Sequence, residues 1–293
     1  MVKFVHRAVM VQDVILYLDP KQGEQVLDGT VGQGGHAGLI VPRVLPDGRF
    51  FGIDRDATNL SVAKESLARW GNRAVFIEGT YRDAKRLLSE HGVKKVDGIL
   101  LDLGFSSLHV DDPSRGFSFM HEGPLDMRYD QSKGRTAADI VNRESEDELA
   151  RLFRVFGEEP NARQIAQAIV ATRENAPIVT TLDLAHRIEA VVPRRGKIHP
   201  ATRVFQALRI EVNEELSQLE AVLPDLVDLL NPGGRLVIIS FHSLEDRIVK
   251  KFFRSEPRLD VLTPKPIRPS LQEIRDNPRA RSSHLRAARR NAL

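Results

Sequence analysis

Cysteine is missing from this chain of 293 residues, and its absence excludes several kinds of site. Without thiols there is no disulfide framework, no thiolate zinc site and no cysteine nucleophile. Long apolar runs are missing too: no stretch of about 18 apolar residues occurs, which excludes a membrane-spanning helix. Residues 1–7 do not lead into the apolar core of a secretory signal peptide. We therefore expect a cytoplasmic protein with no membrane partner.

A large excess of one charge is also absent, because the formal net charge is only +3. The charges are nevertheless unevenly placed. From Lys265 to the end of the chain there are eight Lys and Arg residues against two acids. A second basic cluster contains Arg194, Arg195 and Lys197. Either cluster can contact nucleic-acid phosphates, although a solvated tail explains the charge equally well.

Short apolar runs alternate with helical patterns in the first hundred residues, which is typical of a parallel sheet with crossover helices. The positions of the apolar runs predict strands at residues 25–28, 49–54, 74–79 and 96–103. Apolar residues at helical spacing predict helices at 57–70 and 82–91. The predicted fold class is therefore α/β.

The pattern changes after residue 103. Residues 104–135 are dense in glycine, proline, serine and aspartate, and helical patterns follow them. Ser145 and Glu148 form a possible capping box at the start of one helix. Two more helices are expected at 161–173 and 181–192, without an intervening strand pattern.

A long amphipathic helix is expected to begin near Pro200, and an apolar strand at 235–241 resumes the sheet after a turn at 231–234. The proline-rich, basic tail from about residue 264 is expected to be extended and partly mobile. We thus predict two domains. A core is formed by residues 1–105 and 200–293, and an inserted helical domain by residues 106–199.

A glycine-rich turn follows the first predicted strand. Glycines at a strand-to-helix turn let the backbone approach a ligand closely, and the helix N-terminus favours an anionic group. Asp54 ends the next strand, 20 residues beyond Gly34, where a carboxylate can accept hydrogen bonds from ribose hydroxyls. This pattern predicts a nucleoside-containing cofactor. It leaves NAD and S-adenosylmethionine both open, although the spacing departs from a strict G-x-G-x-x-G.

Asp102 ends the fourth predicted strand, where an open α/β sheet places its reacting group. An exocyclic base amine is a poor nucleophile, and it needs alignment and acceptors for its N–H protons more than a strong base. The Asp102 carboxylate and the Leu103 carbonyl are candidate acceptors. The segment 102–105 weakly echoes the Asp-Pro-Pro-aromatic motif of amino-methyltransferases. A role for Asp102 as a helix or turn cap is the alternative.

Several longer motifs resemble, in family order and over nearly the whole chain, the bacterial 16S rRNA (cytosine-N4)-methyltransferases of the RsmH or MraW type. They are LDGTVGQGGH (27–36), GIDRD (52–56), DGILLDLG (97–104), RGFSF (115–119), GPLDMR (123–128), HPATR (199–203), ISFHSLEDR (239–247) and NPRARS (277–282). The resemblance implies a class I methyltransferase fold, which is Rossmann-like with a mostly parallel sheet, interrupted by an α-helical substrate-recognition domain. It also implies S-adenosylmethionine as cofactor.

The resemblance further implies a set of cofactor-binding residues: Gly34, Gly35, His36, Asp54, Tyr81, Asp102 and His109. Two of these positions depart from the family pattern. His109 stands where glutamine is common, and Tyr81 replaces a frequent phenylalanine while keeping a ring that can stack on adenine. Phe105 replaces an aliphatic residue, and either it stacks on the target base or it packs in the core.

Other residues carry weaker expectations. His242 follows the last strand and is a candidate catalytic residue facing the base, while Ser243 and Asp246 read as a capping box. His6 is a candidate cover for the site. Arg115, Phe117 and Phe119 combine basic and aromatic side chains, as single-stranded RNA binding requires, although they could instead close the loop over the cofactor.

We expect the chain to methylate the N4 amine of a cytosine in 16S rRNA of the small ribosomal subunit, giving N4-methylcytosine; by the resemblance this is cytosine 1402 of the decoding centre. Arg115, Phe117, Arg194, Arg195 and Lys197 are the candidate RNA contacts. No H-E-x-x-H motif occurs and methyl transfer needs no metal, so we expect no metal site. Three alternatives remain: a DNA amino-methyltransferase, a nicotinamide-dependent oxidoreductase, and an RNA-binding assembly factor without catalysis.

Overall fold

The computed structural model describes residues 8–104, 112–194, 196 and 199–292. The chain divides into two compact units, which are treated separately below. Unit 1 combines residues 1–106 with residues 216–293, and unit 2 comprises residues 107–215. The second boundary thus falls 16 residues later than the one drawn from the sequence, at 215 instead of 199.

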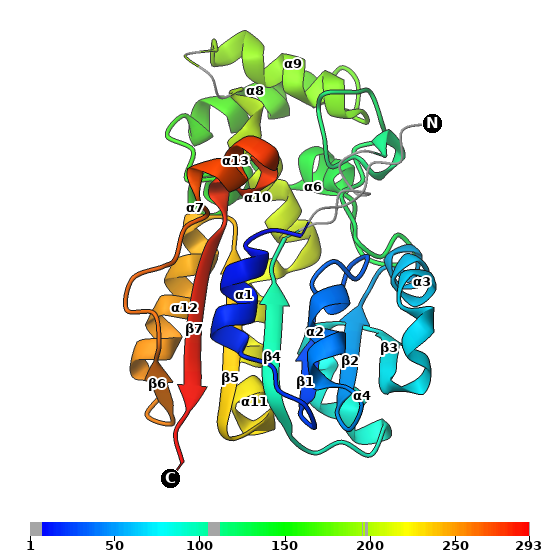
Figure 1. The fold of residues 1–293 in the computed structure, drawn as a ribbon. Coiled ribbons are helices and arrows are strands. Elements are labelled where there is room, and N and C mark those ends of the chain that lie inside the picture. The colour runs from blue at the N-terminus through cyan, green and yellow to red at the C-terminus, as the bar shows by residue number, and fades with distance from the viewer. Residues whose placement is uncertain (1–7, 105–111, 195, 197–198, 293) are drawn as a thin grey trace. The chain divides into compact units, whose positions relative to one another are not determined.

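Unit 1 is built on a seven-stranded sheet with the strand order β3-β2-β1-β4-β5-β7-β6 (Figure 1). The first five strands run parallel, and β7 runs antiparallel to both of its neighbours. This topology confirms the predicted Rossmann-like, mostly parallel sheet. The strands are β1 (Gln25–Asp28), β2 (Arg49–Asp54), β3 (Ala74–Glu78), β4 (Val96–Asp102), β5 (Leu230–Ser240), β6 (Leu259–Val261) and β7 (His284–Arg290).

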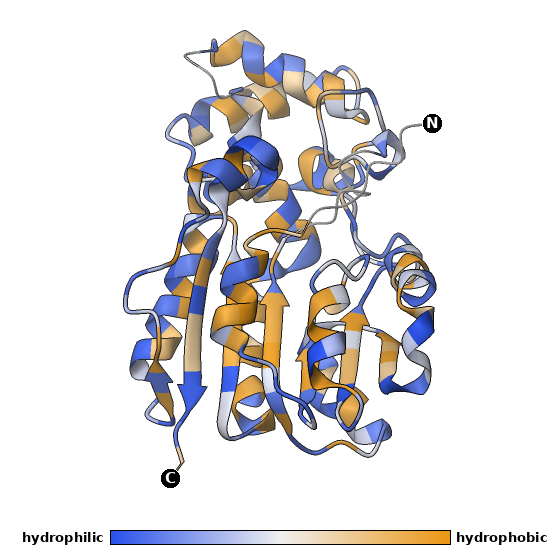
Figure 2. Ribbon diagram, in the orientation of Figure 1, coloured by the Kyte–Doolittle hydropathy of each residue, from blue (hydrophilic) through white to orange (hydrophobic). Residues whose placement is uncertain are grey.

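Both faces of this sheet are buried, because successive strand residues point to opposite sides and both sides are apolar. Phe50 joins the core on one face and Phe51 the core on the other. Figure 2 shows the central strands of this sheet, β1, β2 and β4, as largely hydrophobic. One face is covered by α1 (Val11–Leu18), α2 (Ala37–Val44) and α3 (Ala57–Ser66), and the other by α4 (Ala84–Glu90), α11 (Glu215–Leu229) and α12 (Ser243–Ser255).

The C-terminal segment is extended in its last part, as expected, but there it is a strand of the sheet and not a loose tail. Residues 284–290 form β7, which pairs with β5 from Arg235↔Arg289 to Ser240↔His284. Leu285, Ala287 and Ala288 are fully buried in it, so apolar burial fixes a segment that its arginines made look solvated. Two short helices precede the strand: α13 (Leu271–Asp276) and η4 (Pro278–Ser282).

The long helix expected from Pro200 is two helices. The first, α10 (Ala201–Asn213), ends at Glu214, whose φ of +51° lies in the left-handed region that breaks a right-handed helix. The second, α11, begins at the next residue. Residues 231–234, expected as a turn, lie within β5, where the pairing with β4 is irregular.

Unit 2 is helical, as the patterns predicted. Its helices are η3 (Pro113–Arg115), α6 (Ala137–Arg143), α7 (Glu146–Val155), α8 (Ala162–Arg173), α9 (Thr181–Val191) and α10. Ser145 caps α7 through its hydroxyl, which accepts the Glu148 N–H. The helices enclose a core of their own around Leu149, Phe153 and Leu208. Within the described residues of both units, no helix has the length and apolar content needed to cross a membrane.

Candidate active site

Three neighbouring strands of unit 1 each end in an aspartate. Asp28 ends β1, Asp54 ends β2 and Asp102 ends β4. Because β1 pairs in parallel with β2 on one side and with β4 on the other, all three carboxyl groups lie along one edge of the sheet. The strand order reverses between β1 and β4, and open α/β sheets bind ligands at that point, outside the carboxyl ends of the strands. This carboxyl edge is the candidate site.

The turn from β1 into α2 depends on its glycines. Gly34 has a φ of +86°, and a Cβ atom there would lie 3.1 Å from Leu67 Cδ1. A Cβ on Gly29 would lie 2.5 Å from Leu101 Cδ2, closer than real side chains approach. The backbone therefore follows a path that only glycine permits, and it brings main-chain N–H groups to the helix N-terminus.

Asp54 is bound to this turn. Its Oδ2 accepts the Gly32 N–H at 2.9 Å, and its Oδ1 accepts the Asp56 N–H at 2.8 Å. Its Oδ1 also accepts from the Asn59 side-chain amide at 3.5 Å, and a carboxylate offers about four lone-pair sites in all. The structure thus brings together the glycine turn and the acidic strand end, two features that lie far apart in the sequence.

Asp102 is the most unusual of the three acids. Its Oδ1 atom is buried and, among the described residues, has no hydrogen-bond partner. Burial, followed by the negative charges of Asp28 and Glu245, raises the pKa of Asp102 well above its usual range. A buried acceptor without a donor is costly, and such groups concentrate at functional sites. Asp102 is therefore placed to accept a hydrogen bond from a ligand.

Asp28 and Thr30 were not recognised as part of the site from the sequence. Asp28 accepts the Thr30 N–H at 3.0 Å, and the Thr30 hydroxyl accepts the Asp102 N–H at 2.6 Å. Burial raises the pKa of Asp28 to about 7; the Thr30 N–H opposes this rise and the charge of Asp54 adds to it. The available signal was the Asp-Gly-Thr spacing, since Asp side chains often accept from the backbone two residues on.

His36 joins the glycine turn to Asp102. Its Nε2 lies 2.9 Å from the Val9 carbonyl oxygen, which can only accept, so Nε2 carries the proton. The other ring nitrogen, Nδ1, lies 3.7 Å from Asp102 Oδ2. His36 is 6% exposed and immediately precedes α2, so the turn geometry fixes both its backbone and its ring.

His242 lies at the carboxyl end of β5, the strand next to β4. Its Nε2 is 3.4 Å from Glu245 Oε1, and the Glu245 carboxylate accepts the Phe241 N–H at 2.8 Å. The capping box predicted at Ser243 and Asp246 lies one residue earlier, at His242 and Glu245. Asp246 instead forms two hydrogen bonds with the Arg286 guanidinium, at 2.6 and 3.0 Å, so its carboxylate ties α12 to β7.

Tyr81 begins the short helix η2 (Tyr81–Asp83) after β3 and is 9% exposed. Its Cβ lies 3.0 Å from the position that a Cβ on Gly29 would occupy, so Tyr81 packs beside the glycine turn. The carboxyl edge therefore combines backbone donors, an aromatic ring and carboxyl acceptors. Such a set suits a ligand with hydroxyl groups and a ring, together with a reacting partner that carries N–H groups.

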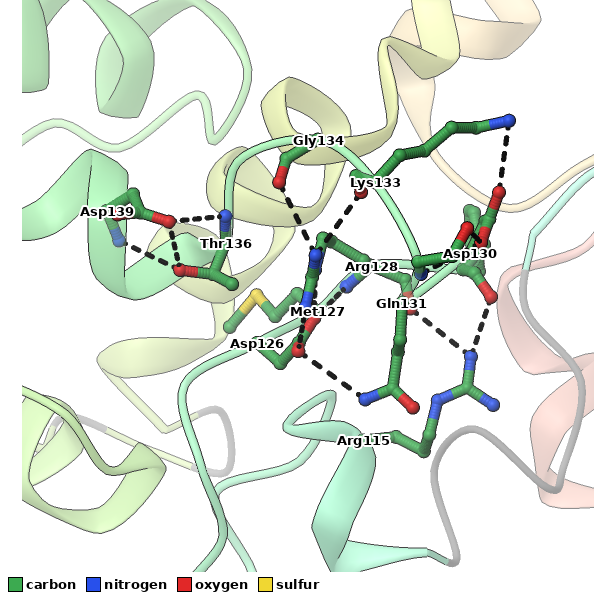
Figure 3. A network of polar contacts seen from close by, with 12 residues as sticks. Arg115, Asp126, Met127, Arg128, Asp130, Gln131, Lys133, Gly134, Thr136 and Asp139 are labelled. Carbon is green, nitrogen blue, oxygen red and sulfur yellow. Dashed lines mark hydrogen bonds and ion pairs between the residues drawn. The ribbon is translucent and has the colours of Figure 1, made fainter.

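Arg115 and Phe117 make contacts within unit 2. One Arg115 nitrogen donates to the Tyr129 carbonyl oxygen at 2.8 Å, and Phe117 stacks on the Tyr129 ring with centroids 5.3 Å apart. Figure 3 shows Arg115 beside a network in which Arg128 holds Asp126 through bonds of 2.8 and 2.9 Å. These contacts order the loop of residues 112–139.

The other predicted RNA contacts are placed only in part. Phe119 packs in unit 2 against His199, at a centroid distance of 4.7 Å, and against Phe205 at 4.9 Å. Arg194 is exposed. The RNA candidates Arg195 and Lys197 lie outside the described residues, as do three other predicted site residues: His6, Phe105 and His109.

Comparison with known proteins gives matches along nearly the whole chain. Ribosomal RNA small subunit methyltransferase H of Syntrophotalea carbinolica is 50% identical, covering 98% of this chain and 98% of its own. The protein of the same name from Thermomicrobium roseum is 49% identical, covering 98% of this chain and 94% of its own. A model of the MraW methylase family matches residues 3–291. The chain therefore belongs to the MraW methylase family.

Proposed function

We propose that the chain transfers the methyl group of S-adenosylmethionine to the N4 amine of a cytosine in the 16S rRNA of the small ribosomal subunit. The product is N4-methylcytosine, and the target is cytosine 1402. The relatives named as small-subunit rRNA methyltransferases support the reaction class and the substrate. The observation that carries the proposal is the buried Oδ1 of Asp102, which has no hydrogen-bond partner among the residues that the structure describes and lies where the strand order reverses. A ribosomal substrate also makes the protein cytoplasmic.

The residues of the carboxyl edge fit this cofactor. Asp54, at the end of β2, is proposed to accept hydrogen bonds from the ribose hydroxyls, and Tyr81 offers a ring for the adenine. Gly34, Gly35 and His36 would hold the amino-acid part at the start of α2, with Asp102 beside it. His109, outside the described residues, is proposed as a further contact. When bound, S-adenosylmethionine supplies an electrophilic methyl group on a sulfonium centre.

The protein's main task is to position the amine. The cytosine would be unpaired or flipped out of its stack, at a cost of a few kcal/mol. Asp102 accepts an N4–H hydrogen bond and so directs the nitrogen lone pair at the methyl group. Holding two reactants in such a geometry can supply about 7–11 kcal/mol of the barrier. As the N–C bond forms and the C–S bond breaks, one N4 proton must leave, and the raised pKa of Asp102 makes its carboxylate a better proton acceptor than an ordinary aspartate.

Neighbouring residues are assigned supporting roles. His242, beside Glu245 at the end of β5, is proposed to face the base. The cluster of Arg194, Arg195 and Lys197 is proposed to contact RNA phosphates through unit 2. Arg115 and Phe117 would then act on RNA indirectly, by ordering the loop that they stabilise.

The direct test uses small ribosomal subunits purified from cells that lack this protein. The purified chain and radiolabelled S-adenosylmethionine are added. The rRNA is then digested to nucleosides, which are separated by chromatography and identified by mass spectrometry. Label in N4-methylcytosine is expected. In a parallel reaction with DNA in place of the subunits, label in DNA but not in rRNA would support a DNA amino-methyltransferase. In a separate binding measurement, binding of NAD in place of S-adenosylmethionine would support an oxidoreductase. Full rescue of subunit assembly by a chain that transfers no methyl group would support an assembly factor.

A further inference from the structure

The connection between β6 and β7 carries a concentration of positive charge. Residues 264–283, called here the basic connection, hold five Lys and Arg residues against two acids. These cations are Lys265, Arg268, Arg275, Arg279 and Arg281, and all five are exposed. In the sequence they looked like part of a solvated tail.

The basic connection is a built part of unit 1. Ile267 forms a two-hydrogen-bond bridge with Leu285 of β7, at 2.9 and 3.0 Å. Ala280 is fully buried and Ser283 is 1% exposed, so the segment is fixed at several points between its cations. The arginines therefore project from a defined scaffold, which lowers the entropy lost when they bind a partner.

The pairing of strands places this scaffold beside the candidate site. His284, the first residue of β7, pairs with Ser240 of β5, and the preceding residue Ile239 pairs with Asp102 of β4. The start of β7 is thus two strand spacings, about 10 Å, from the end of β4. Figure 1 shows α13 at the end of the sheet toward which β4 points.

A chain of contacts also links α13 to the site. The Glu273 carboxylate accepts the Met10 N–H, and the neighbouring Val9 carbonyl oxygen accepts the His36 ring proton. His36 in turn faces Asp102. The basic connection therefore lies against the same N-terminal segment that orients the site histidine.

Four of the five cations of the basic connection are not neutralised by an ion pair within the described part of the chain. Lys265, Arg268, Arg275 and Arg281 form no ion pair there, although the next arginines along β7 do. Arg286 is paired with Asp246, and Arg289 with Asp260. Of the two local acids, Glu273 is bound to the Met10 amide. Exposed cations clustered on one segment are typical of a surface that binds a polyanion.

We propose that the basic connection holds the phosphate backbone of the target RNA strand beside the carboxyl edge. This inference rests on the proposed function and adds to it a surface within unit 1 itself. Arg guanidinium groups bind phosphate oxygens without reading sequence, so the surface sets the position and direction of the strand. The identity of the methylated base is then left to the carboxyl edge around Asp102.

The test compares two double variants of the full chain. Arg275→Gln with Arg281→Gln removes charge from the basic connection, and Arg73→Gln with Lys94→Gln removes the same charge next to the amino ends of β3 and β4. Binding of a labelled single-stranded RNA that carries the target sequence is followed over a series of KCl concentrations. For the first pair, the slope of log affinity against log salt should fall by about 1.4, and affinity should fall about tenfold. The second pair should leave both near the wild-type values.

Cofactor affinity and melting temperature should match the wild type in both variants, because all four side chains are exposed. An unchanged slope for the first pair, with wild-type RNA binding and methyl transfer intact, would overturn this surface while leaving the proposed function standing. An equal loss in the second pair would overturn it as a local surface. Loss of binding to whole subunits but not to free RNA would assign the basic connection to a ribosomal protein. If the wild-type chain neither binds nor methylates RNA, both the proposed function and this surface are contradicted.

Discussion

At the carboxyl edge of unit 1, Asp28 and Asp102 are buried with few donors, whereas in residues 112–139 of unit 2 every aspartate has a matched partner. Burial raises the pKa of both Asp28 and Asp102. In unit 2, hydrogen bonds from Ser132 and Lys133 lower the pKa of Asp130 to about 2. For Asp126, burial acts in the opposite direction, yet the hydrogen bonds from Arg128 still lower the pKa.

The two regions therefore use acids for different purposes. A satisfied acid such as Asp126 stabilises the folded chain, because its negative charge is compensated where it lies. A buried acid without a donor among the described residues, such as Asp102, costs stability, and such groups concentrate at functional sites. The contrast distinguishes acids that stabilise the fold from acids that are candidates for ligand binding. It can be tested by substituting an acid of each kind.

The largest effect is expected at Asp102. Asp102→Ala removes the proposed acceptor for the target amine, so kcat for methyl transfer should fall by about 10²–10⁴. Asp102→Asn keeps one acceptor oxygen and should lose less. The melting temperature of both variants should match or exceed that of the wild type, since a costly buried acid is gone. Single-turnover methylation and calorimetry measure the two quantities. Wild-type turnover by Asp102→Ala would show that this acid is structural.

Asp28→Asn should stabilise unit 1 at alkaline pH. Between an ordinary aspartate pKa and about 7, the folded chain holds a proton on Asp28 that the unfolded chain has released, so the free energy of unfolding falls as pH rises through this window. The gain on removing the charge is at most about 4 kcal/mol at pH 8, and it should vanish near pH 4. Fluorescence of Trp70, the only tryptophan, reports unfolding of this unit in urea. A gain that does not depend on pH would contradict the assignment.

Asp126→Asn should act with the opposite sign. A lowered pKa means that the stabilisation is fully present above the ordinary aspartate range and is lost only as pH falls through the lower, folded value. The variant should therefore lose about 1–2 kcal/mol of stability at neutral pH, with little change between about pH 5 and 8. Hydrogen exchange in α6 measures this loss. A pH dependence like that of Asp28 would erase the distinction between the regions.

The smallest effect compares two glycines in the same backbone conformation. Gly34 has a φ of +86° and Gly134 a φ of +82°, but only a Cβ on Gly34 would meet other atoms within 4 Å. Both Ala variants should lose about 1 kcal/mol through left-handed strain. Gly34→Ala should lose about 1 kcal/mol more from crowding, together with cofactor affinity. Equal losses, with cofactor binding unchanged, would mean that the glycine turn does not approach the ligand.

Much of the fold was predictable because strand periodicity and turn residues are local signals. The predicted strands at 25–28 and 49–54 match β1 and β2 residue for residue. The strand β7 was missed because its arginines mask a short apolar stripe, and the pairing that buries the stripe involves β5, more than 40 residues away. The break at Glu214 was missed because it depends on backbone conformation rather than on composition.

The candidate site was predictable where a single segment held a recognisable motif or an acid at a strand end. The glycine turn, Asp54 and Asp102 stood out by position alone, and the sheet brings their strands together as expected. The link from Asp102 to Thr30 was not seen, because a hydrogen bond between residues 72 positions apart leaves no periodic signal. The contacts of Arg115 and Phe117 with Tyr129 could not be foreseen, because a sequence does not show which loop folds onto itself.

A crystal structure with S-adenosylmethionine bound decides most directly whether the carboxyl edge is the reaction centre. We expect the ribose hydroxyls on Asp54, the amino-acid part at the start of α2, and the methyl group facing the space beside Asp102 Oδ1. Cofactor bound away from the ends of β1, β2 and β4, or a methyl group that Asp102 does not approach, would contradict the proposed chemistry.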